Sequence, residues 1–372
     1  MRFDVSSTAL LSRLQSISKV IASKNSLPIL DSFLFNLEGN TLTVTASDAR
    51  LVTSVDVMNA QGAGLFAVSA KILLDPLKEL PEQPLTFDIN DENLEIFIHF
   101  QNGKYNFIGQ KGDTYPQQKP LNDNAISISM DAQMLLNGIS RSLFATADDE
   151  LRPVMNGVYF DIHTDDLTFV ASDGHKLVRL RNLAVKSPER ASFILPKKPA
   201  NLLKNLLAKE SEQVLIKFDD NNAYITCTNF EMVCRLIEGR YPNYNSVIPQ
   251  ENPFKVTIDR ISFLNALKRV SVFSNPASSL VKLHLKDSLI TVSAQDIDFS
   301  TSAEERIVCQ FDGTELSIGF KATYLIEILG NISSEEVVLE LADPSRAGLI
   351  VPSENDEDED LLMLLMPMML ND

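Results

Sequence analysis

The stretch FLFNLEGNTLTVTASDARL, residues 33–51, decides the fold because the chain contains two more copies of it. Related stretches follow as VYFDIHTDDLTFVASDGHKL at 158–177 and VKLHLKDSLITVSAQDIDF at 281–299. Each stretch alternates apolar and polar residues and breaks once at a turn, which is typical of a half-buried antiparallel hairpin. We therefore predict three equivalent hairpins, one in each copy of a repeat.

Flanking residues keep the same spacing as the hairpins. The aspartates Asp48, Asp173 and Asp296 are 125 and 123 residues apart, the lysines Lys71, Lys198 and Lys321 are 127 and 123 apart, and the prolines Pro116, Pro242 and Pro367 are 126 and 125 apart. A common step of about this length is the size of a domain. The sequence therefore predicts three tandem domains, at residues 1–122, 123–252 and 253–372.

Helical segments surround each predicted hairpin. Apolar residues at helical spacing, such as Leu10, Leu14 and Ile17, precede the first hairpin, and a strand leading into a second helix follows it. The other two copies repeat this order. We expect an α+β domain in which helices pack on one face of antiparallel sheets.

Charge is distributed unevenly along the chain. The 372 residues include 33 Lys and Arg and 50 Asp and Glu, a formal net charge of −17. The predicted helices reverse that balance, with 14 basic and 5 acidic residues in the windows 8–24, 69–80, 131–145, 196–209, 259–273 and 320–331. A basic face directed at a polyanion explains the segregation, since duplex DNA carries one charge per roughly 1.7 Å of axis. The alternative is that helix surfaces merely carry the basic residues while loops carry the acids.

Motifs for catalysis, metal binding and base-specific DNA readout are missing from the sequence. The 4 histidines are dispersed, the 3 cysteines (Cys227, Cys234, Cys309) form no CxxC pair, and no GxxxxGK[ST] or GxSxG motif occurs. We expect no metal and no cofactor. His175 beside Asp173 could serve as a general base, but the equivalent turns lack a histidine. We expect the repeated aspartates to shape turns through hydrogen bonds to the backbone.

The C-terminal region combines an acidic and an apolar run. The acidic run ENDEDED at 354–360 is predicted to be a solvated hairpin loop between the last two strands. The apolar run LLMLLMPMML at 361–370 is shorter than the roughly 20 residues of a membrane span, and it reads as a terminal core strand. With no signal-peptide pattern at the N-terminus and no disulfide framework, we expect a cytoplasmic protein.

Five short stretches, taken in order along the chain, resemble bacterial DNA polymerase III beta subunits, the sliding clamps that act as processivity factors. They are LPIL at 27–30, ASDGHKL at 171–177, GRYPNY at 239–244, IGFKATYL at 318–325 and MPMML at 366–370. The resemblance implies a homodimer of three clamp domains per subunit, joined head to tail as a closed ring with sheets outside and helices inside. It implies a non-catalytic tether around duplex DNA. It also implies docking of the replicative polymerase, the clamp loader and repair proteins through short peptides between the second and third domains.

The resemblance also implies three sets of site residues. The DNA-binding positions are Lys24, Lys71, Arg152, Lys197 and Lys198. The partner-peptide pocket comprises Met155, Ser172, Gly174, His175, Lys176, Leu177, Pro242, Val247, Leu364, Met366, Pro367, Met368 and Met369. The dimer interface comprises Lys104, Tyr105 and Phe107 on one surface and Phe273, Glu304 and Glu305 on the other.

Several positions depart from the family pattern. Met369 stands where the family usually has arginine, residues 371–372 extend the chain, and residues 245–246 stand where some members carry arginines. We expect a less basic pocket with a different preferred peptide; its flexible methionines suit varied partners. Pro153 and Val154 replace tyrosines of some members, which puts DNA contacts from that loop in doubt.

Two other classes of protein remain open on the sequence. One is a triplicated scaffold that binds proteins and never touches nucleic acid. The other, more distant, is an enzyme that uses Asp173 and His175. Retention on circular but not on linearised DNA separates a ring from both.

Overall fold

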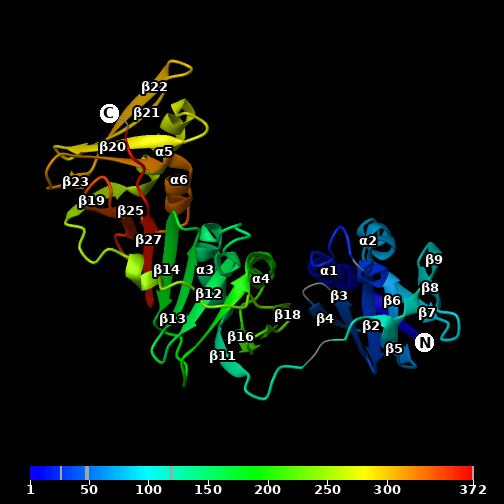
Figure 1. Ribbon diagram of the computed structural model, residues 1–372. Helices are drawn as coiled ribbons and strands as arrows, with labels where there is room; N and C mark the ends of the chain where they lie inside the picture. Colours follow the sequence, from blue (N-terminus) through cyan, green and yellow to red (C-terminus); the bar gives the residue numbers. More distant parts are fainter. Residues whose placement is uncertain (26, 47–49, 118–119, 371–372) are drawn as a thin grey trace. The chain divides into compact units, whose positions relative to one another are not determined.

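The computed structural model describes residues 1–25, 27–46, 50–117 and 120–370 (Figure 1). The chain forms two compact units, one made of residues 1–135 and 202–236 and the other of residues 136–201 and 237–372. We call them unit 1 and unit 2. Among the residues that the structure describes, no helix is both long and apolar enough to cross a membrane.

All six predicted helices are present. They are α1 Ser7–Ser18, α2 Ala70–Lys78, α3 Ala132–Ser142, α4 Lys197–Leu207, α5 Arg260–Val270 and α6 Ala322–Gly330. Short 3-10 turns occur at Pro28–Asp31, Gly112–Thr114, Leu143–Ala145, Pro153–Met155, Tyr244–Val247 and Ser271–Phe273. The first helical window extended to residue 24, and that was wrong. Helix α1 ends at Ser18, although the apolar spacing of Leu10, Leu14 and Ile17 continues to the buried Val20, so Lys24 lies beyond the helix.

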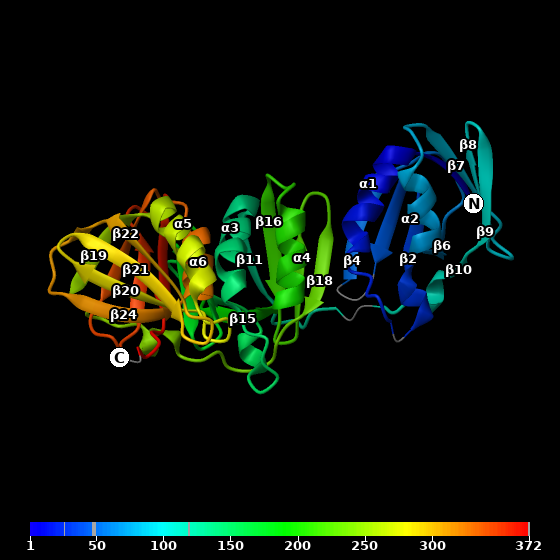
Figure 2. The ribbon, with the colours of Figure 1, turned by 90° about the horizontal axis from the view of Figure 1, so that it is seen from above.

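Unit 1 contains a five-stranded and a nine-stranded antiparallel sheet. Their orders are β5-β1-β7-β8-β9 and β10-β6-β2-β3-β4-β18-β17-β16-β11. The strands are β1 Arg2–Ser6, β2 Ser32–Glu38, β3 Thr41–Ala46, β4 Arg50–Asp56, β5 Met58–Gln61, β6 Gly64–Ser69, β7 Pro84–Ile89, β8 Glu95–Phe100, β9 Gly103–Ile108, β10 Gln110–Lys111, β11 Ile126–Asp131, β16 Gln213–Phe218, β17 Asn222–Thr226 and β18 Glu231–Arg235. Helices α1 and α2 pack side by side, α1 against β3 and β4 and α2 against β2 and β6 (Figure 2).

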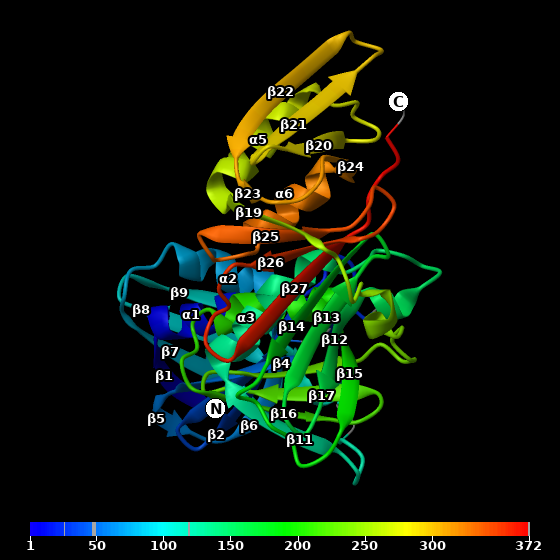
Figure 3. The ribbon, with the colours of Figure 1, turned by 90° about the vertical axis from the view of Figure 1, so that its left-hand side faces the viewer.

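Unit 2 contains a nine-stranded and a four-stranded antiparallel sheet. Their orders are β15-β12-β13-β14-β27-β26-β25-β19-β23 and β22-β21-β20-β24. The strands are β12 Gly157–Ile162, β13 Leu167–Ser172, β14 Lys176–Asn182, β15 Ala191–Pro196, β19 Phe254–Asp259, β20 Leu280–Lys286, β21 Leu289–Asp296, β22 Thr301–Val308, β23 Gln310–Phe311, β24 Leu316–Lys321, β25 Glu336–Leu341, β26 Gly348–Pro352 and β27 Glu359–Leu365. Figure 3 shows β27 running alongside β14.

The three predicted hairpins are confirmed as β2–β3, β12–β13 and β20–β21. Each nine-stranded sheet, however, takes strands from two neighbouring copies of the repeat. Strand β4 of the first copy pairs with β18 of the second, and β14 of the second pairs with β27 of the third. We call these strand pairs the first and the second seam. The chain therefore has three copies of the repeat but two compact units, and the domain boundaries remain a prediction.

The predicted role of the repeated aspartates is confirmed where the structure describes them. The Asp173 Oδ1 atom accepts hydrogen bonds from the backbone N–H groups of His175 and Lys176, at 2.8 and 2.9 Å. The Asp296 Oδ1 atom accepts one from Asp298 N–H at 2.9 Å. Asp48 and residues 371–372 lie outside the described residues.

The acidic run 354–360 is only partly a solvated loop. Its last two residues belong to β27, so that part of the prediction was wrong. Glu359 is buried and forms an ion pair with Arg141 at 2.9 Å, and Asp360 forms one with Arg179 at 3.0 Å. The ion pair with Arg141 compensates the burial of the Glu359 carboxylate, whereas Asp360 is only half-buried. The apolar run that follows is core, as predicted, since Met363 and Leu365 are fully buried in β27.

Candidate functional site

The predicted peptide pocket gathers around the second seam, inside unit 2. Strands β14 and β27 pair over seven residues, from Lys176 opposite Leu365 to Asn182 opposite Glu359. Because side chains alternate along a strand, Leu177 and Leu364 lie opposite each other and share one face of the sheet. That face carries a buried apolar cluster of Val170, Leu177, Ile194, Tyr241, Tyr244, Ile248, Ala347, Leu349, Leu362 and Leu364.

The predicted pocket residues divide into a buried set and an exposed set. Met155, Ser172, Lys176, Leu177 and Leu364 are buried. Gly174, His175, Pro242, Val247, Met366 and Met369 are exposed, with Met369 77% accessible, whereas Pro367 and Met368 are half-buried. Exposed apolar side chains beside a buried cluster form a surface on which a partner can bury further apolar area. We call this surface the peptide site.

The turn at residues 172–176 is held in one conformation by its own hydrogen bonds. Ser172 Oγ donates to the Lys176 carbonyl at 2.9 Å and accepts from Gly174 N–H at 3.1 Å. Gly174 has a φ of +92°, and a Cβ atom there would lie 2.9 Å from Arg152 Nη1. Glycine is therefore favoured by the backbone conformation, whereas the Arg152 side chain is flexible and could move aside for a Cβ atom.

Lys176 is a buried lysine compensated by carboxylates. Its Nζ atom lies 2.7 Å from Glu327 and 3.5 Å from Asp173. The same ammonium lies 4.2 Å from the ring centroid of Tyr324 and 5.7 Å from that of Phe144. Two ion pairs and two aromatic faces stabilise a charge that burial alone would disfavour.

Tyr324 and Lys321 belong to this group of side chains, and the sequence-based list of pocket residues missed both. The Tyr324 ring lies 6.3 Å from the His175 ring, and Lys321 Nζ lies 4.7 Å above its centroid. Both residues stand in the stretch IGFKATYL, with the lysine three residues before the tyrosine at the start of α6. Lys321 ends strand β24 and caps α6, and Tyr324 lies in the first turn of that helix, so the strand-to-helix junction brings the two side chains together.

The C-terminal segment is fixed by backbone hydrogen bonds to two sides of the peptide site. Met366 N–H donates to the His175 carbonyl and Met368 N–H to the Gly319 carbonyl, both at 2.8 Å. A Cβ atom at Gly319 would lie 2.7 Å from the Met368 carbonyl oxygen. The backbone of this segment is thus anchored, while the side chains of Met366 and Met369 remain accessible.

The predicted DNA-binding residues are divided between the two units. Lys24 and Lys71 are exposed in unit 1, with Lys71 in the first turn of α2. In unit 2, Lys197 pairs with Asp148 at 2.6 Å and Arg152 with Asp149 at 2.7 Å. Lys198 is exposed on the first turn of α4.

Two further basic side chains of unit 1, absent from the sequence-based list, lie where α1 approaches the end of α4. Arg13 and Lys209 line a small cavity of about 160 Å³ there. Arg13 donates to Asn229 at 2.9 Å, and Asn229 in turn donates to Glu210 at 2.9 Å. The only sequence signal for these residues was the excess of basic residues on the helices.

The predicted interface residues other than Phe273 lie on two unpaired sheet edges. Phe273 lies in the 3-10 turn Ser271–Phe273, which packs against β22, and its side chain is exposed. Strand β9, with Lys104, Tyr105 and Phe107, ends the five-stranded sheet of unit 1, and β22, with Glu304 and Glu305, ends the four-stranded sheet of unit 2. Glu305 is held by Arg269 through two hydrogen bonds of 2.8 and 2.6 Å. Exposed edge strands are available for pairing with another chain.

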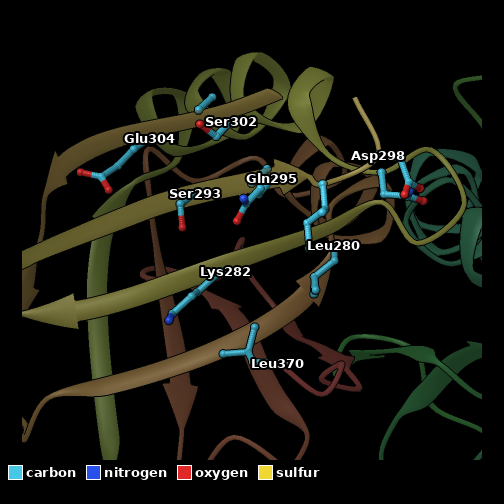
Figure 4. A pocket seen from close by; sticks show the side chains of 12 residues that line it. Leu280, Lys282, Ser293, Gln295, Asp298, Ser302, Glu304 and Leu370 are labelled. Carbon is cyan, nitrogen blue, oxygen red and sulfur yellow. The ribbon is translucent and has the colours of Figure 1, made fainter. Parts of the chain in front are cut away.

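A hollow of about 600 Å³ lies on the outward face of the four-stranded sheet (Figure 4). Its lining includes Lys282, Gln295, Glu304 and, at one side, Leu370. Of the predicted site residues, only Glu304 lines it. The residues that line the hollow therefore include none of those assigned to the peptide site.

The chemistry of the described residues gives no indication of a metal site or a reactive thiol. Within residues 1–25, 27–46, 50–117 and 120–370, no three His, Cys, Asp or Glu side chains gather as metal ligands. Burial raises the pKa of the Cys227 and Cys234 thiols to about 12. Both thiols therefore stay protonated and unreactive at neutral pH.

Comparison with known proteins gives consistent matches along the whole chain. Models of the N-terminal, central and C-terminal domains of the DNA polymerase III beta subunit match residues 1–120, 129–243 and 245–369. The beta sliding clamp of Pseudomonas aeruginosa is 28% identical over 373 residues, and that of Haemophilus influenzae 27% over 375, each covering 100% of both chains.

Solved structures match equally completely. The crystal structure of the Pseudomonas aeruginosa sliding clamp bound to griselimycin has a TM-score of 0.94 at 27% identity. That of the Bartonella birtlesii sliding clamp bound to griselimycin has a TM-score of 0.91 at 26% identity. Both comparisons cover 100% of each chain.

Proposed function

This chain belongs to the DNA polymerase III beta subunit family, and from that premise we propose that two copies close head to tail into a ring around duplex DNA. Its function is that of a sliding clamp, a non-catalytic accessory subunit that makes DNA polymerase III processive. The scaffold and enzyme alternatives are thereby set aside. We propose that the protein acts in the cytoplasm, because a DNA sliding clamp must reach the DNA that the polymerase copies.

Ring closure is supported by an incomplete pattern of strand pairing. At both seams, the strand that follows a hairpin pairs with the last strand of the next copy: β4 with β18, and β14 with β27. The corresponding strands β22 of the third copy and β9 of the first end their sheets unpaired. A second copy of the chain supplies both missing neighbours: its β9 pairs with β22 of the first chain, and its β22 pairs with β9 of the first chain. These two contacts close a dimer into a ring.

The two seams share one register, which predicts the register of the third. In the first seam Leu51 lies opposite Met232, and in the second Val178 lies opposite Met363. Leu51 and Val178 are equivalent because each also pairs with an alanine that stands two residues before the repeated aspartate. Leu51 pairs with Ala46, and Val178 pairs with Ala171. Met232 and Met363 are equivalent because each pairs with a buried isoleucine, Ile225 or Ile350. Each isoleucine in turn lies opposite the fourth residue of the strand before it, Ile216 of β16 or Leu339 of β25.

The same criteria identify the equivalent residues on the open edges. Ala303 of β22 pairs with Ala294, two residues before Asp296. Tyr105 of β9 pairs with the buried Ile98, which lies opposite Phe87, the fourth residue of β7. Placing Ala303 opposite Tyr105 of the partner subunit sets Glu304 opposite the partner's Lys104. Opposite charges directly across two strands stabilise the pairing.

A charge exchange tests the ring interface. Lys104→Glu or Glu304→Lys alone places like charges at both interfaces of a ring, which weakens dimerisation by roughly tenfold. The double variant restores an opposite pair at each interface and recovers most of the lost affinity in sedimentation equilibrium. A double variant no better than the singles contradicts this register.

Encirclement of DNA is tested by topology. A loaded ring stays on circular DNA and slides off the ends of linearised DNA, whereas an ordinary DNA-binding protein stays on both. The triple variant Lys24→Glu, Lys197→Glu, Lys198→Glu reverses three charges and is expected to reduce loading or retention. Lys186→Glu, an exposed lysine outside the helices, is the control and leaves retention unchanged. Unchanged retention of the triple variant contradicts the assigned DNA-facing positions.

Partner binding is assigned to the peptide site. Polymerase, clamp loader and repair proteins each contribute a short peptide that buries apolar side chains against the accessible Met366, Met369 and Val247. The relatives solved with griselimycin bind a ligand, which supports a ligand site in this chain as well. Deletion of residues 366–372 should abolish capture of a fluorescent polymerase-derived peptide while the dimer persists. Retained capture contradicts the site.

A further inference from the structure

The peptide site contains two lysines around one aromatic ring, and their charges are compensated very differently. Lys176 is buried and carries ion pairs to Glu327 and Asp173. Lys321 is half-buried, and no carboxylate of the described residues lies within ion-pair distance of its Nζ atom. Of the two lysines, therefore, Lys321 is the one whose charge has no carboxylate partner in the part of the chain that the structure describes.

Lys321 is also held in a defined position. Its backbone pairs with Leu280 in the four-stranded sheet, and its ammonium lies 4.7 Å above the Tyr324 ring. The attraction between the cation and the ring restricts the flexible lysine stem. A partner that binds this ammonium consequently loses less conformational entropy than one that must first order a free lysine.

The location of Lys321 links it to the rest of the peptide site. The Tyr324 ring that carries it also faces His175, whose carbonyl holds Met366. Two residues before Lys321, the Gly319 carbonyl holds Met368. A peptide lying on the exposed methionines would thus come within reach of the uncompensated ammonium.

We propose that Lys321 selects peptides that carry an aspartate or glutamate beside their apolar residues. This inference rests on the proposed function of the peptide site. The carboxylate accepts a charge-assisted hydrogen bond from the Lys321 ammonium, while the neighbouring apolar residue packs on Tyr324. The sequence suggested a less basic pocket because Met369 replaces an arginine; the structure supplies a basic group from the end of β24, directly before α6, on another wall of the same site.

The test is a positional scan of one peptide. A fluorescein-labelled, polymerase-derived peptide is synthesised with aspartate, and in a matched set with asparagine, at each position in turn, and each Kd is measured by anisotropy. We expect one position at which the full-length wild-type protein prefers aspartate by roughly fivefold to tenfold. In Lys321→Gln that preference falls below twofold, while the asparagine peptide binds as it does to wild type.

The control separates a local contact from the general field of the protein. Lys282→Gln removes a lysine of the adjoining strand β20, which lines the hollow in Figure 4, and should leave the preference intact. Equal loss of preference in Lys282→Gln and Lys321→Gln, or no aspartate preference in the wild type, overturns the inference. Failure of every peptide to bind the wild type contradicts the proposed function of the site itself.

Discussion

The first and second seams join copies of the same repeat, yet they differ in extent and in chemistry. Among the residues that the structure describes, the first pairs three residues of β4 with three of β18. Its polar contacts include hydrogen bonds to uncharged groups, from Arg13 to the Asn229 side-chain amide and from Thr53 to the Asn229 carbonyl. The second pairs seven residues of β14 with seven of β27. It adds the ten-residue apolar cluster and ion pairs such as that of Arg141 with Glu359.

The difference shows what a repeat determines and what it leaves to individual side chains. The repeat fixes which strands meet, because equivalent strands pair in the same register at both seams. How firmly they are joined depends on the length of the pairing and the area buried beside it. The firmer seam is the one that carries the peptide site, and a binding surface gains affinity when its supporting structure is rigid.

The largest expected effect comes from the apolar cluster of the second seam. Leu364→Ala removes a buried side chain, 3% exposed, and should lower the free energy of unfolding of unit 2 by about 4 kcal/mol. The equivalent change in the first seam, Val233→Ala, removes fewer atoms and should cost unit 1 about 2 kcal/mol. Urea-dependent hydrogen exchange measures both units in one experiment. Equal losses of unfolding free energy in the two variants would contradict the proposal that the second seam is joined more firmly than the first.

A smaller effect is expected from the arginines. Arg141→Ala leaves the buried Glu359 without that cation and should cost unit 2 about 3 kcal/mol. Arg13→Ala removes a hydrogen bond to a neutral amide and should cost unit 1 about 1 kcal/mol. The same exchange experiment compares them, and a larger cost for Arg13→Ala would contradict the contrast.

The penalty of Arg141→Ala should depend on pH. Burial raises the pKa of the Glu359 carboxyl, and the Arg141 charge opposes that rise. A carboxyl whose pKa is higher in the folded than in the unfolded protein lowers the free energy of unfolding at pH values above its ordinary pKa. As the pH falls through the folded-state pKa, the carboxyl becomes protonated and this loss of stability disappears. Without Arg141 the pKa rises further, so the penalty should be larger at pH 7.5 than at pH 5. A Glu359→Gln background should abolish this difference.

The smallest effect concerns the unmodified protein. Amide protons of the β14–β27 pairs should exchange at least about tenfold more slowly than those of the β4–β18 pairs, because longer pairing beside a larger cluster opens less often. Exchange followed by mass spectrometry resolves peptides from all four strands. Faster exchange in β14 than in β4 would reverse the assigned order of the seams.

Local periodicity explains why much of the fold could be predicted from the sequence. The hairpins and the six helices follow from apolar spacing of two and of about 3.6 residues, as in TLTVTA and around Leu10 and Leu14. The turn at Asp173 follows from the short reach of its carboxylate. These features depend on residues close together in the chain.

The features that the sequence did not reveal depend on residues far apart in the chain. Nothing in the alternation of KLVRLRN indicates that β14 pairs with a strand that begins at Glu359. The burial of Glu359 follows from that pairing, as does the position of Met366 beside His175. The family resemblance named the residues assigned to the peptide site, and that assignment remains a prediction. Lys321 and Tyr324 were not named, because their position beside Lys176 and His175 depends on contacts between segments far apart in the chain.

Sheets that cross the boundaries of the repeat constrain how the protein can be dissected. A fragment cut out as the middle copy alone would expose β18 at one side and β14 at the other, each stripped of its neighbour. Bare strand edges of this kind recruit further strands, so such a fragment should self-associate into chains rather than behave as a monomer. Gene fragments intended for separate expression are better ended so that each seam strand keeps its neighbour.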